Sequence, residues 1–110
     1  MTHYQRGRRL EWDVQHDLAA HGYITLRAAS SKGAADVIGF KPGQVVFVQA
    51  KTNGLIPPAE RVALLHLASL IPGALAIVAA RPTTTYRRLT GPGPKDWVSW
   101  TPDELEEVTA

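Results

Sequence analysis

The sequence contains no cysteine and no long hydrophobic run. Without cysteine among its 110 residues, the chain cannot form disulfides, thiolate zinc sites or cysteine nucleophiles. The best apolar run is ALAIVAA at 74–80, far short of the roughly 20 residues that a membrane helix needs. The charged start, MTHYQRGRRLEWD, lacks the apolar core of a signal peptide, so we expect a cytoplasmic protein. Any chemistry must come from oxygen, imidazole or amine groups.

The composition is 45% hydrophobic and 20% charged, and we expect residues 1–110 to form one small globular domain. The charge is unevenly distributed. Residues 1–95 carry all twelve Lys and Arg side chains against five acids, a net charge of +7, whereas residues 96–110 carry five acids and no base. A basic body of this kind attracts polyanions, above all nucleic acids.

Hydrophobic periodicity predicts a mixed α/β chain. Apolar residues at helical spacing predict a helix over 7–21, and a second helix is predicted over 59–71. Strands are predicted at 23–29, 34–40, 45–51 and 74–81, with shorter strands at 85–89 and 97–100 and a final helix at 101–108. The order αβββαβ therefore predicts a mixed β-sheet flanked by helices.

The two strands at 34–40 and 45–51 carry polar residues where plain strands would be apolar. If Pro42 and Gly43 form the turn between them, Asp36 lies opposite Gln49, and Lys51 projects from the same face. A carboxylate buried there without a partner costs several kcal/mol, so it needs a cation or hydrogen bonds. The residues leave two interpretations open, an Asp36–Lys51 ion pair that is only structural and an oxygen site for Mg²⁺ or Mn²⁺.

The predicted first helix carries further charged residues of interest. Glu11 lies at the edge of the apolar stripe of this helix, where it could reach a neighbouring sheet. Three arginines precede it at the helix start, where positive charge opposes the helix dipole. A phosphate partner would explain them. These arginines are Arg6, Arg8 and Arg9.

Residues 4–51, from YQRGRRLEWD through SSKGAAD to VVFVQAK, resemble the front half of the PD-(D/E)XK nuclease superfamily, most closely its archaeal-type Holliday junction resolvases. The resemblance implies a restriction-endonuclease-like fold and a metal-dependent, structure-specific DNA endonuclease. It also implies that Asp36 is the principal metal ligand, with Gln49 as the second ligand and Lys51 as the catalytic lysine. Glu11 would then complete the metal site.

The same resemblance implies DNA contacts and a dimer. Arg27 matches a strand arginine that contacts a phosphate, and the loop of Ser30, Ser31 and Lys32 matches one that approaches the DNA backbone. Such resolvases are homodimers that cut four-way junctions. Gln49 departs from the usual glutamate, which removes one negative charge and predicts weaker metal binding. Two alternatives follow, a DNA-binding or assembly module that does not cut and a related nuclease with another DNA substrate.

Overall fold

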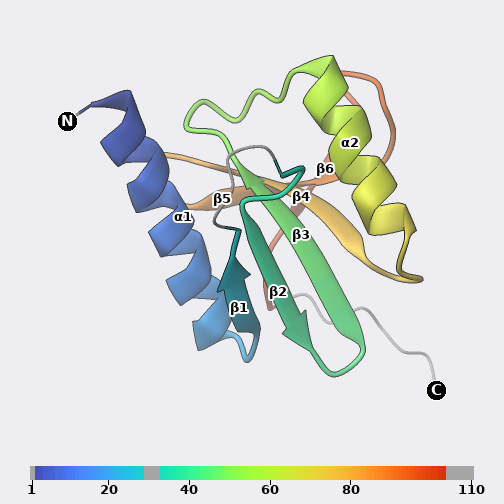
Figure 1. The fold of residues 1–110 in the computed structure, drawn as a ribbon, viewed down its shortest axis with the longest axis horizontal. Helices are drawn as coiled ribbons and strands as arrows, with labels where there is room; N and C mark the ends of the chain where they lie inside the picture. The colour runs from blue at the N-terminus through green and yellow to red at the C-terminus, as the bar shows by residue number, and fades with distance from the viewer. Residues whose placement is uncertain (1, 29–32, 104–110) are drawn as a thin grey trace.

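The computed structural model describes residues 2–28 and 33–103, without the side chains of residues 3, 4 and 6. Two helices and six strands make up this part of the chain: α1 (His3–Ala20), β1 (Ile24–Arg27), β2 (Val37–Lys41), β3 (Gln44–Ala50), α2 (Pro58–Ser69), β4 (Leu75–Ala80), β5 (Thr85–Leu89) and β6 (Trp97–Trp100). The strands form one sheet in the order β1-β2-β3-β4-β5-β6, in which only β3 and β4 run parallel (Figure 1). The predicted mixed sheet and the order αβββαβ are confirmed.

Helix α1 begins four residues earlier than the periodicity predicts. Thr2 and Gln5 form a capping box, in which Thr2 Oγ1 accepts a hydrogen bond from the Gln5 amide at 3.1 Å and Gln5 Oε1 accepts one from the Thr2 amide at 3.0 Å. These bonds satisfy N–H groups that a helix start otherwise leaves unpaired, so the helix extends to His3. At its other end the chain turns at Gly22, whose φ of 89° suits glycine.

The β2–β3 hairpin has the turn and pairing that the sequence predicts. Gly43 has a φ of 79°, and the partners run from Lys41 with Gln44 to Val37 with Val48. The predicted pair of Asp36 with Gln49 is not formed, because the regular ladder stops one pair earlier. Asp36 lies in a bend, where its main-chain N–H donates to the Val48 carbonyl at 2.8 Å. The bend turns the chain at the point where the acid stands.

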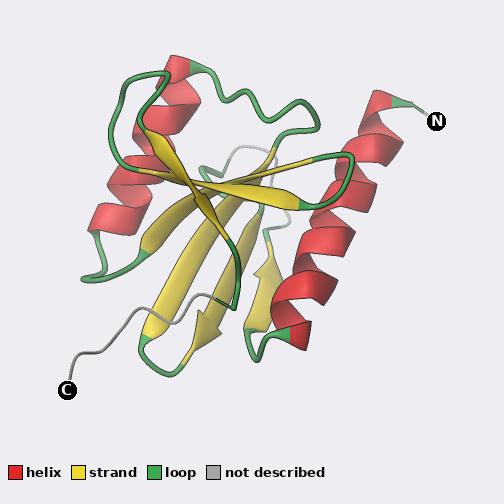
Figure 2. Cartoon of the chain, turned by 180° about the vertical axis from the view of Figure 1, so that it is seen from behind, coloured by secondary structure: helices red, strands yellow, loops and turns green. Residues whose placement is uncertain are grey.

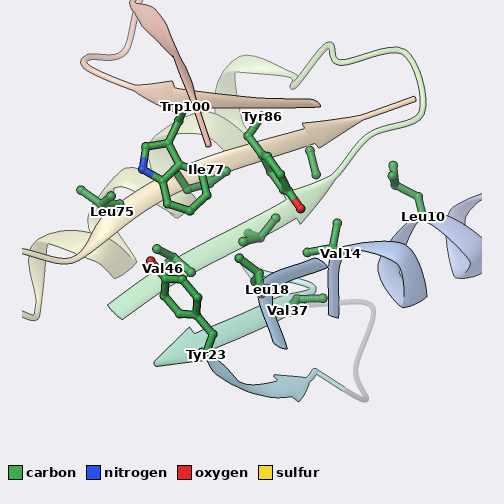
Figure 3. Close-up of a cluster of buried hydrophobic side chains, with 12 residues drawn as sticks. Leu10, Val14, Leu18, Tyr23, Val37, Val46, Leu75, Ile77, Tyr86 and Trp100 are labelled. Atoms are coloured by element: carbon green, nitrogen blue, oxygen red, sulfur yellow. The ribbon is translucent and has the colours of Figure 1, made fainter. Parts of the chain in front are cut away.

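The two helices pack on opposite faces of the sheet. Side chains alternate along β3, so Val46 and Val48 belong to the core under α1 and Phe47 belongs to the core under α2. Figure 3 shows the α1 side, where the helix inserts three apolar residues toward the strands. These residues are Leu10, Val14 and Leu18. Strand β4 is buried along its whole length, as predicted for the run at 74–81.

Strands β5 and β6 extend the sheet beyond β4 and form its other edge. Figure 2 views the molecule from behind and shows β5 and β6 crossing in front of the parallel pair at a steep angle, which carries the last described residues back across the sheet. The predicted strands at 85–89 and 97–100 are confirmed. The predicted final helix at 101–108 falls mostly on residues 104–110, which lie outside the described part. Neither described helix is long and apolar enough to span a membrane.

Candidate active site

Asp36 stands at the end of the sheet where β2 begins and β3 ends. Its Oδ2 accepts a hydrogen bond from the Ala50 amide at 2.8 Å. The side chain thereby supplies the acceptor that the interrupted ladder no longer offers to this N–H group. The bend before β2 thus has a structural partner in the carboxylate, and the sheet positions that carboxylate beside the residues that follow β3.

Burial raises the pKa of the Asp36 carboxyl above its ordinary value, because desolvation disfavours the charged form. The negative charges of Glu11 and Glu60 raise this pKa further, while the Ala50 hydrogen bond and the positive charge of Lys51 lower it. The net shift is upward. The carboxylate therefore lies in surroundings that favour an additional positive charge beside it.

Gln49 and Lys51 converge on one acid, Glu60 in the first turn of α2. Lys51 Nζ lies 2.7 Å from Glu60 Oε1, and Gln49 Nε2 donates to the same oxygen at 3.1 Å. The sequence predicted that Asp36, Gln49 and Lys51 converge on one spot. Glu60 joins Gln49 and Lys51, while Asp36 hydrogen-bonds to the Ala50 amide. Their common partner comes from the helix after the hairpin and not from the hairpin itself.

The Gln49 side chain is buried and only half satisfied. The residue is 8% exposed, and its Oε1 is a buried oxygen with no hydrogen-bond partner among the described residues. Buried polar atoms of native proteins nearly always have a partner, so an orphaned acceptor calls for an explanation. A carbonyl oxygen without a donor is available to a hard cation such as Mg²⁺.

Glu11 approaches the site from the α1 side of the sheet. Its Oε1 accepts a hydrogen bond from Arg27 Nε at 2.8 Å, and only 17% of the Glu11 side chain is exposed. Helix α1 and strand β1 thus hold the pair together. Glu11 contacts Arg27 and reaches Asp36 through its charge, as the raised pKa of Asp36 reflects.

Arginines predicted to bind DNA line a pocket next to this ion pair. The pocket has a volume of about 420 Å³ and is lined by Arg8, Arg9, Trp12, Gln15 and Arg27. Arg9 also lies over the Trp12 ring and forms an ion pair with a neighbouring aspartate. The Arg6 side chain and residues 30–32, which include Ser30, Ser31 and Lys32, lie outside the described part of the chain.

The donor chemistry of the site fits a divalent metal ion, although the acids alone do not form a cage. Within residues 2–28 and 33–103, no three His, Cys, Asp or Glu side chains stand close enough together to hold a metal ion. The oxygens at the sheet end are the Asp36 carboxylate, the orphaned Gln49 Oε1 and the Glu60 carboxylate. All are hard donors of the kind that Mg²⁺ and Mn²⁺ prefer.

Glu60 is the member of this cluster that the sequence analysis missed. It stands nine residues after Lys51, in the first turn of a predicted helix, where acidic residues are common because they favour the helix dipole. Nothing in the local pattern distinguishes it from an ordinary helix-start acid. The one signal for Glu60 in the sequence is the missing charge at Gln49, which suggests that another acid stands near this position.

Comparison with known proteins places this site in a family. A solved structure, the Holliday junction resolvase Hjc of Archaeoglobus fulgidus, matches 76% of this chain and 70% of its own with a TM-score of 0.61 and 24% identity, which shows a common fold. No protein of curated function matches in sequence. The model of the archaeal Holliday junction resolvase (Hjc) family matches residues 2–108. The chain therefore belongs to the archaeal Holliday junction resolvase family, a family of structure-specific endonucleases acting on Holliday junctions within the PD-(D/E)XK nuclease superfamily.

Proposed function

We propose that this chain hydrolyses phosphodiesters in four-way DNA junctions with Mg²⁺ or Mn²⁺ bound at the end of β3. The observation that carries the proposal is Gln49 Oε1, a buried oxygen without a partner among the described residues, on the residue before Ala50, whose amide binds the half-buried Asp36 carboxylate. A carboxylate whose pKa is raised by burial and an amide oxygen with no donor among the described residues suit a divalent ion better than they suit a plain hairpin end.

Each residue then has a role that follows from its place. Asp36 and Gln49 hold the ion, which when bound supplies Lewis-acid charge and lowers the pKa of water. Lys51 offers its ammonium group to the charge that builds up on the phosphate, and the helix acid Glu11 supports the ion from the α1 side. Arg27 holds Glu11 at 2.8 Å, so it joins this acid to the arginine-lined pocket.

The arginine-lined pocket is the proposed contact to the DNA backbone. Arg8 and Arg9 bring positive charge to its rim, and Arg6 with the loop of Ser30, Ser31 and Lys32 would extend the contact. We expect Arg9→Gln to weaken junction binding and to lower the salt slope by about one, because one phosphate contact is lost. The measurement is junction affinity at several salt concentrations in an Asp36→Ala background, and an unchanged slope would contradict this role.

The proposed dimer uses the part of the sheet that neither described helix covers. In Figure 1, α2 stands over β3 and β4 and leaves the front of β1 and β2 bare. Ile24 and Leu26 project from that face and are 70% and 55% exposed. Apolar exposure of this kind on a sheet marks an interaction site, and a second copy would supply the second active centre that a two-fold junction needs.

Cleavage of three DNA substrates tests the proposed reaction. Purified protein with Mg²⁺ or Mn²⁺ should nick a four-way junction in preference to a flap or a linear duplex. Asp36→Ala and Lys51→Ala should abolish nicking while the circular dichroism spectrum stays that of a folded protein. Asp103→Asn is the matched control, because it removes one exposed acid beyond β6. Cleavage that survives Asp36→Ala would overturn the proposal.

The amide at position 49 favours one alternative, a junction-binding module that does not cut. Gln49 carries no negative charge, so the described residues form no three-acid metal site. Under this alternative, binding to the four-way junction is tight and salt-sensitive, and no nicks form with any divalent metal. A gel-shift measurement on the same four-way junction, made beside the cleavage assay, separates the two functions, since it measures binding where the cleavage assay measures nicking.

A further inference from the structure

Glu60 occupies a position that lets one carboxylate oxygen serve two residues of the site. Its Oε1 accepts from Gln49 Nε2 at 3.1 Å and from Lys51 Nζ at 2.7 Å. Its charge also acts on Asp36, whose pKa it helps to raise. The acid comes from α2, and the residues it contacts come from the end of β3. The contact therefore links the helix to the proposed metal site.

The hydrogen bond from Gln49 to Glu60 determines which atom of the Gln49 amide is available to a cation. Because Nε2 donates to Glu60, the other amide atom, Oε1, remains buried and without a partner among the described residues. A flipped amide would place its oxygen against the carboxylate oxygen of Glu60, which repels it, and would leave its NH₂ group without that acceptor. Glu60 therefore selects the orientation in which a cation can bind the amide oxygen.

The same acid restores the charge that an amide at position 49 removes. Asp36 and Glu60 together carry two negative charges at the end of the sheet, the number that an acid at position 49 would give with Asp36 alone. Position 60 is also favourable for a carboxylate because it lies in the first turn of α2, near the positive end of the helix dipole.

We propose that Glu60 is the positioning residue that takes over the part of the carboxylate missing from position 49. It turns Gln49 Oε1 into a metal donor, holds the Lys51 ammonium group and adds its charge to that of Asp36. This inference rests on the metal site of the proposed function. A purely structural alternative assigns Glu60 only an ion pair and a helix start.

Metal affinity measured without DNA tests the inference. Mn²⁺ binding by isothermal titration should weaken about tenfold in Glu60→Gln, because a single charge–charge term of ordinary size is lost. The double variant Gln49→Glu with Glu60→Gln exchanges the amide and the carboxylate, keeps the hydrogen bond between them and should return the affinity to within about threefold of the wild type. Asp103→Asn should bind Mn²⁺ like the wild type.

Thermal unfolding of the same variants shows whether a change in Mn²⁺ affinity comes from a loss of folded structure. Gln49→Glu alone places two carboxylates against each other, so it should lower the melting temperature in chelator. Added Mn²⁺ should raise its melting temperature more than that of the wild type. If Glu60→Gln does not fold, Glu60→Asp, which keeps the charge, is measured in its place. Glu60→Gln that is less stable yet binds Mn²⁺ like the wild type would overturn the inference in favour of the structural alternative.

Failure of the inference and failure of the proposed function give different results. Mn²⁺ binding that depends on Glu60, in a protein that cuts no junction, overturns the proposed function and supports the inference. Junction cleavage at wild-type rate and wild-type Mn²⁺ requirement in Glu60→Gln overturns the inference alone. A wild-type protein that binds no Mn²⁺ overturns both.

Discussion

Asp36 shows at the scale of one residue how a functional group can work against stability. Its carboxylate is half-buried, and burial together with Glu11 and Glu60 raises its pKa despite the help of the Ala50 amide and Lys51. The folded protein therefore binds a proton at this position more tightly than the unfolded chain does. In the absence of metal, ionised Asp36 is a cost to the fold.

The pH dependence of stability tests this cost. An acid whose pKa is raised on folding contributes stability at low pH, and this contribution is lost as the pH rises through the folded-state pKa. We expect Asp36→Asn to be more stable than the wild type at neutral pH in chelator, because the amide keeps an acceptor for Ala50 without the charge. The two proteins should differ less in acidic buffer, where Asp36 is protonated.

Urea unfolding at both pH values provides the measurement. A wild-type protein that is the more stable one at neutral pH in chelator would contradict the prediction. Addition of Mn²⁺ should reverse the order, because only the ionised carboxylate binds the ion well.

At the scale of elements, Gly39 sets the distance between α1 and the sheet. A Cβ at this position of β2 would lie 3.1 Å from Val46 Cγ2, 3.2 Å from Leu18 Cδ1 and 3.3 Å from Tyr23 Cδ2. Figure 3 shows these three side chains gathered under the helix. The contact distances are shorter than ordinary van der Waals separations, so glycine allows the close approach.

Gly39→Ala should therefore destabilise the fold by about 1–3 kcal/mol, the usual cost of an overpacked core. The free energy of unfolding in urea measures this effect. Gly7→Ala is the matched control, because a Cβ there meets no atom within 4 Å and the residue lies in α1, where alanine is favourable. Equal stability of Gly39→Ala and the wild type would show that α1 can shift without cost.

A hydrogen bond ties α1 to β5. The Tyr86 hydroxyl donates to Asp17 Oδ2 at 2.6 Å, and burial together with this bond raises the pKa of Tyr86. Tyr86→Phe removes the bond and leaves the ring in the core. We expect a loss of about 1–2 kcal/mol of folding free energy, since hydrogen bonds to charged groups exceed the typical value. Denaturant unfolding measures it, and junction cleavage should stay unchanged because Tyr86 and Asp17 hydrogen-bond to each other and not to Asp36, Gln49, Lys51 or Glu60.

At the scale of the whole molecule, the bare front of β1 and β2 predicts a dimer. Leu26→Lys places a charge on this face and should convert the protein to a monomer, as measured by light scattering after gel filtration. Val62→Lys is the matched control, because Val62 is 54% exposed on α2, which lies over β3 and β4 and not over β1 and β2. The monomer should still nick junctions but should lose paired incision of both strands. A Leu26→Lys dimer would contradict the proposed interface.

Charge is distributed unevenly along the whole chain. The first 95 residues hold a net charge of +7, and the described arginines of α1 and β1 gather at one pocket beside Glu11. The sequence alone showed the basic excess. Only the fold brings Arg8 and Arg9 from α1 together with Arg27 from β1, since seventeen residues separate Arg9 from Arg27 along the chain.

The sequence by itself determined the element order, the hairpin turn and its register, because these depend on neighbours along the chain. Pro42 with Gly43 specified the turn, and the alternation of apolar residues specified the strand faces. Local pattern also indicated Asp36, Gln49 and Lys51 as unusual for strands. The early start of α1 was missed, although Thr2 and Gln5 carried a local signal for it.

The tertiary structure alone decided which side chains contact each other at the site. The bend at Asp36 ended the ladder before the Gln49 pair, Arg27 engaged Glu11, and α2 delivered Glu60 to Lys51. Such contacts join elements whose separation along the chain carries no information about their distance in space. The physical reason is that packing of α1 and α2 on opposite faces, and not any periodicity, brings these charges to one end of the sheet.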